Sequence, residues 1–150
     1  MGIKVAVGSD HRGFAIKKVM ISLLESLGNE VQDMGPFSEV SVDYPEFASK
    51  VASAVENNFC DRGVLICGSG IGMSIAANKF KGVRATLCHD LHTAEMCRRH
   101  NDSNLLVMGE ALGAELSLAM LKVWLSTAFE GGRHQDRLDL INEIEKKNFK

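Results

Sequence analysis

The residues best suited to chemistry are a cysteine and the alternating glycines that follow it, in the stretch Cys67-Gly68-Ser69-Gly70-Ile71-Gly72. Glycines at this spacing leave backbone N–H groups free to converge on an anion, and the dipole of a following helix favours negative charge at the same place. A thiol immediately before such donors could be held as a thiolate and act as a base. The stretch therefore indicates proton transfer beside a bound or developing anion.

Other interpretations of this glycine loop fit less well. The dinucleotide-binding fingerprint requires G-x-G-x-x-G after the first strand, with an acidic residue about 20 positions on. Here the glycines are two apart and run on into Asn78-Lys79-Phe80. A phosphate-binding P-loop needs a lysine that Gly72-Met73-Ser74 does not supply, and the G-x-S-x-G of a serine hydrolase is absent. A tight strand-to-helix turn would explain one or two glycines, but less naturally three.

The remaining cysteines, Cys60, Cys88 and Cys97, are expected to be small buried hydrophobic residues, which is the usual state of a free cysteine. No C-x-x-C pair is present, and the sequence shows no signal segment and no uncharged stretch long enough to span a bilayer. We therefore expect reduced thiols, a cytoplasmic location and no contact with a membrane.

Of the five histidines, His11 and His100 lie in polar clusters at expected loop positions, where a role in proton transfer and a structural role are equally open. His89 and His92 could be metal ligands. No third ligand stands at a suitable spacing, so surface positions are favoured for both and no metal is expected.

Arg133 and Arg137 are four residues apart and so share one face of the last expected helix. Cations near a helix N-terminus oppose its dipole by roughly 0.3–1 kcal/mol, so the pair calls for a compensating anion. A phosphate would serve, and a salt bridge to Glu130 or Asp136 is the alternative.

Short β-branched runs alternate with amphipathic segments and must position these residues. Strands are expected at 3–7, 30–34, 63–67, 84–88 and 105–108. Helices are expected around Ile16 to Leu27 and Phe47 to Val55, over 73–80 and 91–99, from Leu112 to Val123, and along Leu138, Ile141 and Ile144. This alternation predicts a three-layer, Rossmann-like α/β fold, in which a five-stranded parallel sheet carries helices on both faces.

In such a sheet, ligands gather at the carboxyl ends of the strands, near the point where the strand order reverses. Asp10-His11 follows the first strand and the glycine loop follows the third. His100-Asn101-Asp102 also joins this polar set, although it precedes its own strand, so its place at that edge is less well defined.

The length of 150 residues suits a single domain over residues 1–150. Lys plus Arg number 17 against 19 for Asp plus Glu, and this net charge of −2 argues against a dedicated nucleic-acid binder. The last helix follows Gly131-Gly132 and has few elements left to pack on, so we expect it to dock on a second subunit.

Taken together, these residues resemble the type B ribose-5-phosphate isomerase family, which also contains the galactose-6-phosphate isomerase subunits. The blocks that carry the likeness are Ser9-Asp10-His11, Ser41-Val42-Asp43-Tyr44-Pro45, the run from Cys67 to Lys79, His100-Asn101, and Gly131-Gly132-Arg133-His134 with Arg137. They span nearly the whole chain. The resemblance implies a homodimer or a dimer of dimers, with active sites at the subunit interface. It also implies a small sugar phosphate as substrate and no metal or organic cofactor.

The resemblance also implies residue roles. Cys67 would remove the proton from C2 of the open-chain sugar, the N–H groups of Gly68 to Gly72 would stabilise the enediolate oxygen, and Ser69 would assist proton transfer. His100 would help to open the furanose ring, with Asp10 holding the ring oxygen or a hydroxyl. Tyr44 and Asn101 would hold hydroxyls of the sugar. The phosphate would be held by His11, Arg133 and Arg137 and, across the interface, by His134.

Two positions depart from the family pattern. Many relatives carry threonine where this chain has Ser69, so the hydroxyl is kept and a change only in rate or positioning is expected. Some have an arginine just after the glycine that follows the fifth strand, where this chain has Glu110 after Gly109.

Some relatives use a glutamate of the glycine loop as the base, but this loop offers no acid and Cys67 keeps the role.

The leading expectation is an isomerase for ribose 5-phosphate and ribulose 5-phosphate. The alternatives are the same chemistry on an allose, galactose or erythrose phosphate, or a non-catalytic sensor of sugar phosphates or nucleotides. Such a sensor could dispense with Cys67 and His100. A nicotinamide dehydrogenase fails on the spacing and position of the glycines.

Overall fold

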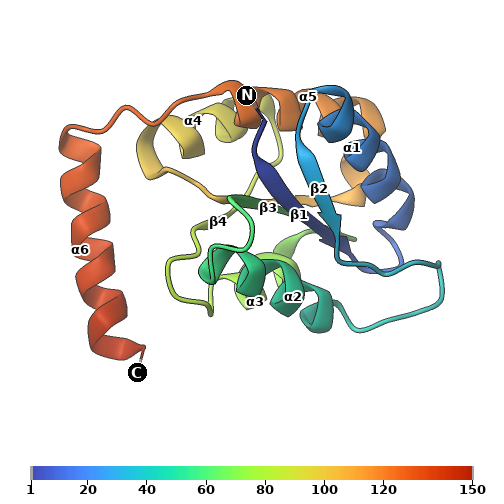
Figure 1. The fold of residues 1–150 in the computed structure, drawn as a ribbon, viewed down its shortest axis with the longest axis horizontal. Coiled ribbons are helices and arrows are strands. Elements are labelled where there is room, and N and C mark those ends of the chain that lie inside the picture. The colour runs from blue at the N-terminus through green and yellow to red at the C-terminus, as the bar shows by residue number, and fades with distance from the viewer. Residues whose placement is uncertain (1, 150) are drawn as a thin grey trace.

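A five-stranded parallel sheet in the order β2-β1-β3-β5-β4 forms the centre of the molecule (Figure 1). The computed structural model describes residues 2–149. The inner strands β1, β3 and β5 are almost entirely buried, as a parallel sheet covered on both faces requires. The five parallel strands predicted from the sequence are confirmed, with bounds β1 (Lys4–Ser9), β2 (Glu30–Asp33), β3 (Arg62–Cys67), β4 (Ala85–Leu87) and β5 (Leu105–Gly109).

Helices cover both faces of the sheet, as predicted. One face packs against α1 (Phe14–Ser26), α4 (Leu91–Asn101) and α5 (Ala114–Ser126), and the other against α2 (Tyr44–Glu56) and α3 (Ile71–Ala77). Leu112 was expected in the helix that is now α5, but it lies in a short 3-10 turn, η1 (Glu110–Leu112). Gly113 separates the two because its φ of +82° interrupts the helical path.

The strand order reverses between β1 and β3. The chain leaves β1 to form β2 on one side of it and returns to form β3 on the other side. The connections that follow β1 and β3 therefore diverge and leave a crevice at their carboxyl ends, which is the usual ligand site of an open parallel sheet. Asp10 and the glycine loop begin at these two ends.

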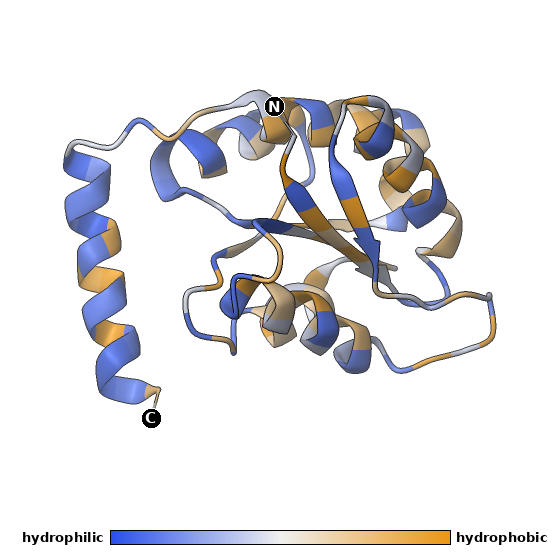
Figure 2. Ribbon diagram, in the orientation of Figure 1, coloured by the Kyte–Doolittle hydropathy of each residue, from blue (hydrophilic) through white to orange (hydrophobic). Residues whose placement is uncertain are grey.

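Helix α6 (Arg133–Asn148) stands apart from the sheet and its covering helices (Figure 1). It is hydrophilic over most of its surface, with a few hydrophobic positions along it (Figure 2). Leu138 is buried within its own chain, whereas Ile141 and Ile144 remain 46% and 61% exposed. They line a groove of about 390 Å³ between α6 and the region around β4. The docking of α6 on a second subunit stays a prediction.

No helix in the described part of the chain combines the length and the apolar character that crossing a membrane would require.

Candidate active site

Cys67 ends β3 and is only 5% exposed. Its Sγ atom accepts a hydrogen bond from the N–H of Gly70 at 3.1 Å, and the Oγ atom of Ser69 accepts one from the N–H of Ile71 at 3.2 Å. Two of the backbone donors expected to face an anion are therefore occupied by the loop's own side chains. The N–H of Gly72, in the first turn of α3, has no partner within its own helix and is one of the loop donors left for a ligand.

The glycines of this loop are required by its contacts. Gly70 has a φ of +83°, and a Cβ atom on it would lie 2.5 Å from the side chain of Leu87 and 3.0 Å from the backbone of Met108. A Cβ atom on Gly72 would lie 2.5 Å from the ring of Tyr44. The absence of a side chain at Gly72 thus lets Tyr44, at the start of α2, lie against the glycine loop. Its contact with sugar hydroxyls stays a prediction.

Replacing Gly70 by alanine should cost activity as well as stability, because both the positive φ and the two close contacts would distort the loop. We expect a loss of about 2 kcal/mol of stability or more and a clear fall in kcat, measured by thermal unfolding and initial rates. The matched control is Gly82→Ala, since Gly82 also has a positive φ (+72°) but no atom within 4 Å of an added Cβ. Equal effects of the two substitutions on kcat would contradict a specific role for the loop.

Asp10 and His11 follow β1 at the same edge of the sheet. The Oδ1 atom of Asp10 accepts the N–H groups of Arg12 and Gly13 at 2.9 and 3.0 Å, which leaves Oδ2 as the atom that could contact a sugar. The Nδ1 atom of His11 accepts the N–H of Val42 at 3.2 Å. The proton of a neutral His11 ring therefore lies on Nε2, from which it can be donated to an anion.

Arg12 is a site residue that sequence reasoning missed. Its guanidinium lies over Gly68, where an added Cβ atom would be 2.7 Å from Nη1, and it forms an ion pair with Glu110 at 3.3 Å. The unusual Glu110 is therefore paired with a cation at the rim of the glycine loop. A cavity of about 200 Å³ opens beside this loop, lined by Gly68, Ser69, Ile71, Leu87, Cys88, His89, Gly109, Ala111 and Leu112.

The three remaining cysteines are buried, as predicted. Burial raises the pKa of the Cys60 thiol. The Sγ atoms of Cys88, which follows β4, and Cys97, in α4, lie 3.7 Å apart. Cys67 differs from them because its Sγ atom accepts a hydrogen bond from the glycine loop itself.

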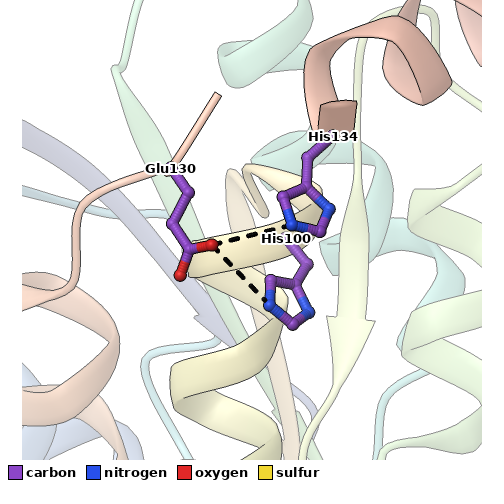
Figure 3. A group of neighbouring side chains, drawn as sticks. All are labelled: His100, Glu130 and His134. Atoms are coloured by element: carbon purple, nitrogen blue, oxygen red, sulfur yellow. Dashed lines mark ion pairs between the residues drawn. The ribbon is translucent and has the colours of Figure 1, made fainter. Parts of the chain in front are cut away.

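A second group of predicted residues lies at the last turn of α4 and the first turns of α6. The rings of His100 and His134 stack, with centroids 4.3 Å apart and planes 12° apart (Figure 3). The Oε1 atom of Glu130 lies 3.6 Å from Nε2 of His134 and 4.0 Å from Nε2 of His100. The pKa of His134 is lowered by burial and further by the charges of His100 and Arg133.

Arg133 and Arg137 are exposed on α6, and neither forms an ion pair within residues 2–149. Glu130, the partner that the alternative interpretation offered them, is held by Arg99 instead, and this bond lowers the pKa of the Glu130 carboxyl. The two arginines therefore keep their charge available for an external anion.

His100 does not join the residues at the carboxyl edge, and the prediction that placed it there is wrong for a single chain. Gly63 pairs with Leu105 at the beginning of β3 and β5, and Cys67 pairs with Gly109 at their ends. Because His100 precedes Leu105, it lies at the amino edge, at least about 13 Å from Cys67 along the strands. We call His100, Asn101, Glu130, Arg133, His134 and Arg137 the amino-edge group, and Asp10, His11, Tyr44 and residues 67–72 the carboxyl-edge group.

His100, Glu130 and His134 bring three possible metal ligands within 4.8 Å of one another. An ion about 2 Å from both Nε2 atoms would have to lie in both ring planes, but these planes are nearly parallel and stacked. The observed arrangement therefore does not suit a metal held by both histidines. His89 and His92 are exposed and lie outside this cluster.

A thiol at a glycine loop on the switch point of a parallel sheet, with a histidine and a carboxylate at the same edge, is suited to proton transfer next to a developing anion. The comparisons with known proteins identify the class of enzyme as a sugar isomerase. Residues 5–141 match the model of the Ribose/Galactose Isomerase family, and the chain belongs to this family.

Individual relatives match over almost their whole length. Ribose-5-phosphate isomerase B of Escherichia coli is 46% identical, with 96% of this chain and 97% of the relative covered. The solved structure of ribose-5-phosphate isomerase B from Clostridium thermocellum is 48% identical and superimposes with a TM-score of 0.94, covering 97% of this chain and 99% of its own. The enzyme from Mycoplasma genitalium, solved with bound ribulose-5-phosphate, has a TM-score of 0.94 at 38% identity, with 99% of each chain covered.

Proposed function

We propose that this protein interconverts ribose 5-phosphate and ribulose 5-phosphate through an enediolate, as a cytoplasmic enzyme. The observation that carries the proposal is Cys67, buried at the switch point with its Sγ atom held by the N–H of Gly70. The names of the Escherichia coli and Clostridium thermocellum relatives, and the ribulose-5-phosphate bound to the Mycoplasma genitalium enzyme, support the choice of substrate.

The carboxyl-edge group supplies the proton transfer. Cys67 takes the proton from C2 of the open-chain aldose and returns it to C1, while negative charge develops on the substrate oxygens. N–H groups of the glycine loop stabilise this charge, since preorganised donors act most strongly where charge appears in the transition state. Ser69 helps to move the proton between the oxygens, and Tyr44 holds a hydroxyl.

The amino-edge group supplies ring opening and phosphate binding, but from a second copy of the chain. His100 and Asn101 cannot reach Cys67 of their own chain, because the two groups lie at opposite edges of the sheet. A two-fold dimer brings each amino-edge group to the partner's carboxyl-edge group, and the exposed Ile141 and Ile144 become part of the interface. The phosphate then lies between His11 and the partner's Arg133, His134 and Arg137.

The test is a set of initial rates with ribose 5-phosphate and with allose, galactose and erythrose phosphates. We expect ribose 5-phosphate to be preferred by about tenfold or more in kcat/KM, since a site that binds hydroxyls rejects substrates that leave its polar groups unpaired. Preference for another aldose phosphate would keep the mechanism and change the substrate. Binding without turnover of any of them would favour a sensor.

A further inference from the structure

Glu130 has no assigned role, yet its carboxylate faces both histidines of the amino-edge group (Figure 3). One carboxylate oxygen accepts a hydrogen bond from Nε of Arg99, and the backbone N–H of Glu130 donates to the backbone oxygen of Arg99 at 3.0 Å. Side chain and backbone together therefore fix Glu130 to α4, the helix that carries His100.

The other oxygen of Glu130 is directed at histidine. Oε1 lies 4.0 Å from Nε2 of His100 and 3.6 Å from Nε2 of His134. The other carboxylate oxygen, Oε2, pairs with Arg99, which compensates the negative charge. Oε1 is thus available to accept a hydrogen bond from a neighbouring imidazole ring, while Arg99 balances the negative charge of the carboxylate.

His134 is the fixed member of the stacked pair. It is 8% exposed, and its Nε2 atom is buried without a hydrogen-bond partner in the described part of the chain. Its buried ring forms a wall against which the half-exposed ring of His100 stacks. The ring of His100 can therefore rotate little out of this plane, and a small shift brings its Nε2 atom to Oε1.

The partner of one ring nitrogen decides which nitrogen of a histidine carries the proton. If Nε2–H of His100 is directed at Glu130, Nδ1 is left as the unprotonated nitrogen that can face a substrate. This is the arrangement in which a carboxylate orients an imidazole and stabilises the imidazolium that forms during catalysis.

We propose that Glu130 is a positioning residue for ring opening, which holds His100 with Nδ1 toward the sugar; this rests on the proposed function. In the step, Nδ1 takes the proton from the anomeric hydroxyl, and the C1–O4 bond breaks with its electron pair going to O4. His100 then gives the same proton to O4, C1 becomes a carbonyl, and His100 returns to its neutral form. Glu130 remains ionised and faces the transient imidazolium.

Glu130→Gln tests this assignment because the amide keeps the size of the side chain and an oxygen for Arg99. Turnover of ribose 5-phosphate, which must be opened from its ring, should fall by at least about tenfold, because an amide in place of the carboxylate that orients a catalytic imidazole lowers kcat strongly. Exchange of solvent deuterium into C1 of ribulose 5-phosphate, followed by NMR, should stay within about twofold of the unmodified protein. This ketose carries phosphate on O5 and forms no five-membered ring, so enediolate formation from it needs no ring opening.

The matched control is Glu95→Gln. Glu95 also pairs with Arg99, at 3.2 Å. In the described part of the chain, however, no ion pair joins Glu95 to His100 or His134. It should leave both rates unchanged. Equal losses of turnover and exchange in Glu130→Gln, or no loss of either, would overturn the positioning role while the unmodified protein remained an isomerase. Absence of turnover by the unmodified protein would instead contradict the proposed function.

Discussion

Replacing Cys67 by alanine should reduce isomerisation of ribose 5-phosphate by about a thousandfold or more, in line with the loss of a general base. No other side chain within residues 67–72 offers a base in its place, because the Oγ atom of Ser69 is a hydroxyl engaged with the N–H of Ile71. The same substitution should abolish deuterium exchange into ribulose 5-phosphate. In this respect it differs from Glu130→Gln, which is expected to spare exchange.

The fold should survive the change, because alanine only removes one buried sulfur and its hydrogen bond from Gly70. We expect a cost of about 1–2 kcal/mol in the free energy of unfolding. Cys60→Ala is the control, since Cys60 is equally buried but lies before β3, at the other end of that strand. It should lose comparable stability and keep full activity. Substantial turnover by Cys67→Ala would show that the base is another group.

Hydrophobic periodicity was sufficient to predict the sheet and the helices that cover it. The continuous apolar runs at 63–67 and 105–108 are typical of buried parallel strands, and both became inner strands, β3 and β5. Leu112 was wrongly assigned to the helix that is now α5, because it stands four residues before Leu116 and so continues the helical spacing of its apolar residues. Only the backbone angle at Gly113 distinguishes the two elements.

The carboxyl-edge group could be predicted from the sequence because each of its residues directly follows a strand or begins a helix. The amino-edge group could not be placed in the same way. His100 ends a crossover helix, and its edge of the sheet depends on which strand comes next in space.

Arg12 and Glu130 were missed as site residues for a related reason. Their partners, Glu110 and Arg99, lie 98 and 31 positions away in the sequence, so no local spacing indicates these ion pairs. A charged side chain near a motif is usually a solvated surface residue, and only the tertiary fold distinguishes these two from that background. Glu110 stands where some relatives have an arginine, and the sequence indicates no partner for it. In the structure it forms an ion pair with Arg12, whose guanidinium lies over the glycine loop.

The separation of the two groups leads to the second large effect, which is recovery of activity on mixing two inactive variants. Cys67→Ala removes the base from every carboxyl-edge group, and His100→Ala removes the ring-opening histidine from every amino-edge group. If each site takes one group from each of two chains, random assembly of the two variants in equal amounts leaves about one quarter of the sites with both groups intact. Coexpression should therefore restore about a quarter of the unmodified activity with ribose 5-phosphate.

The same experiment excludes a site built within one chain. In that case every site would carry one of the two substitutions, and the mixture would be as inactive as its components. Coexpression of Cys67→Ala with Ser69→Ala provides the matched control, because both residues belong to the carboxyl-edge group and every site in the mixture carries one of the two substitutions. Recovery with His100→Ala but not with Ser69→Ala would assign the two halves of the site to different subunits. Such a result would also explain why α6 projects from its own chain with Ile141 and Ile144 exposed, since the helix would carry Arg133 and Arg137 to the partner's substrate.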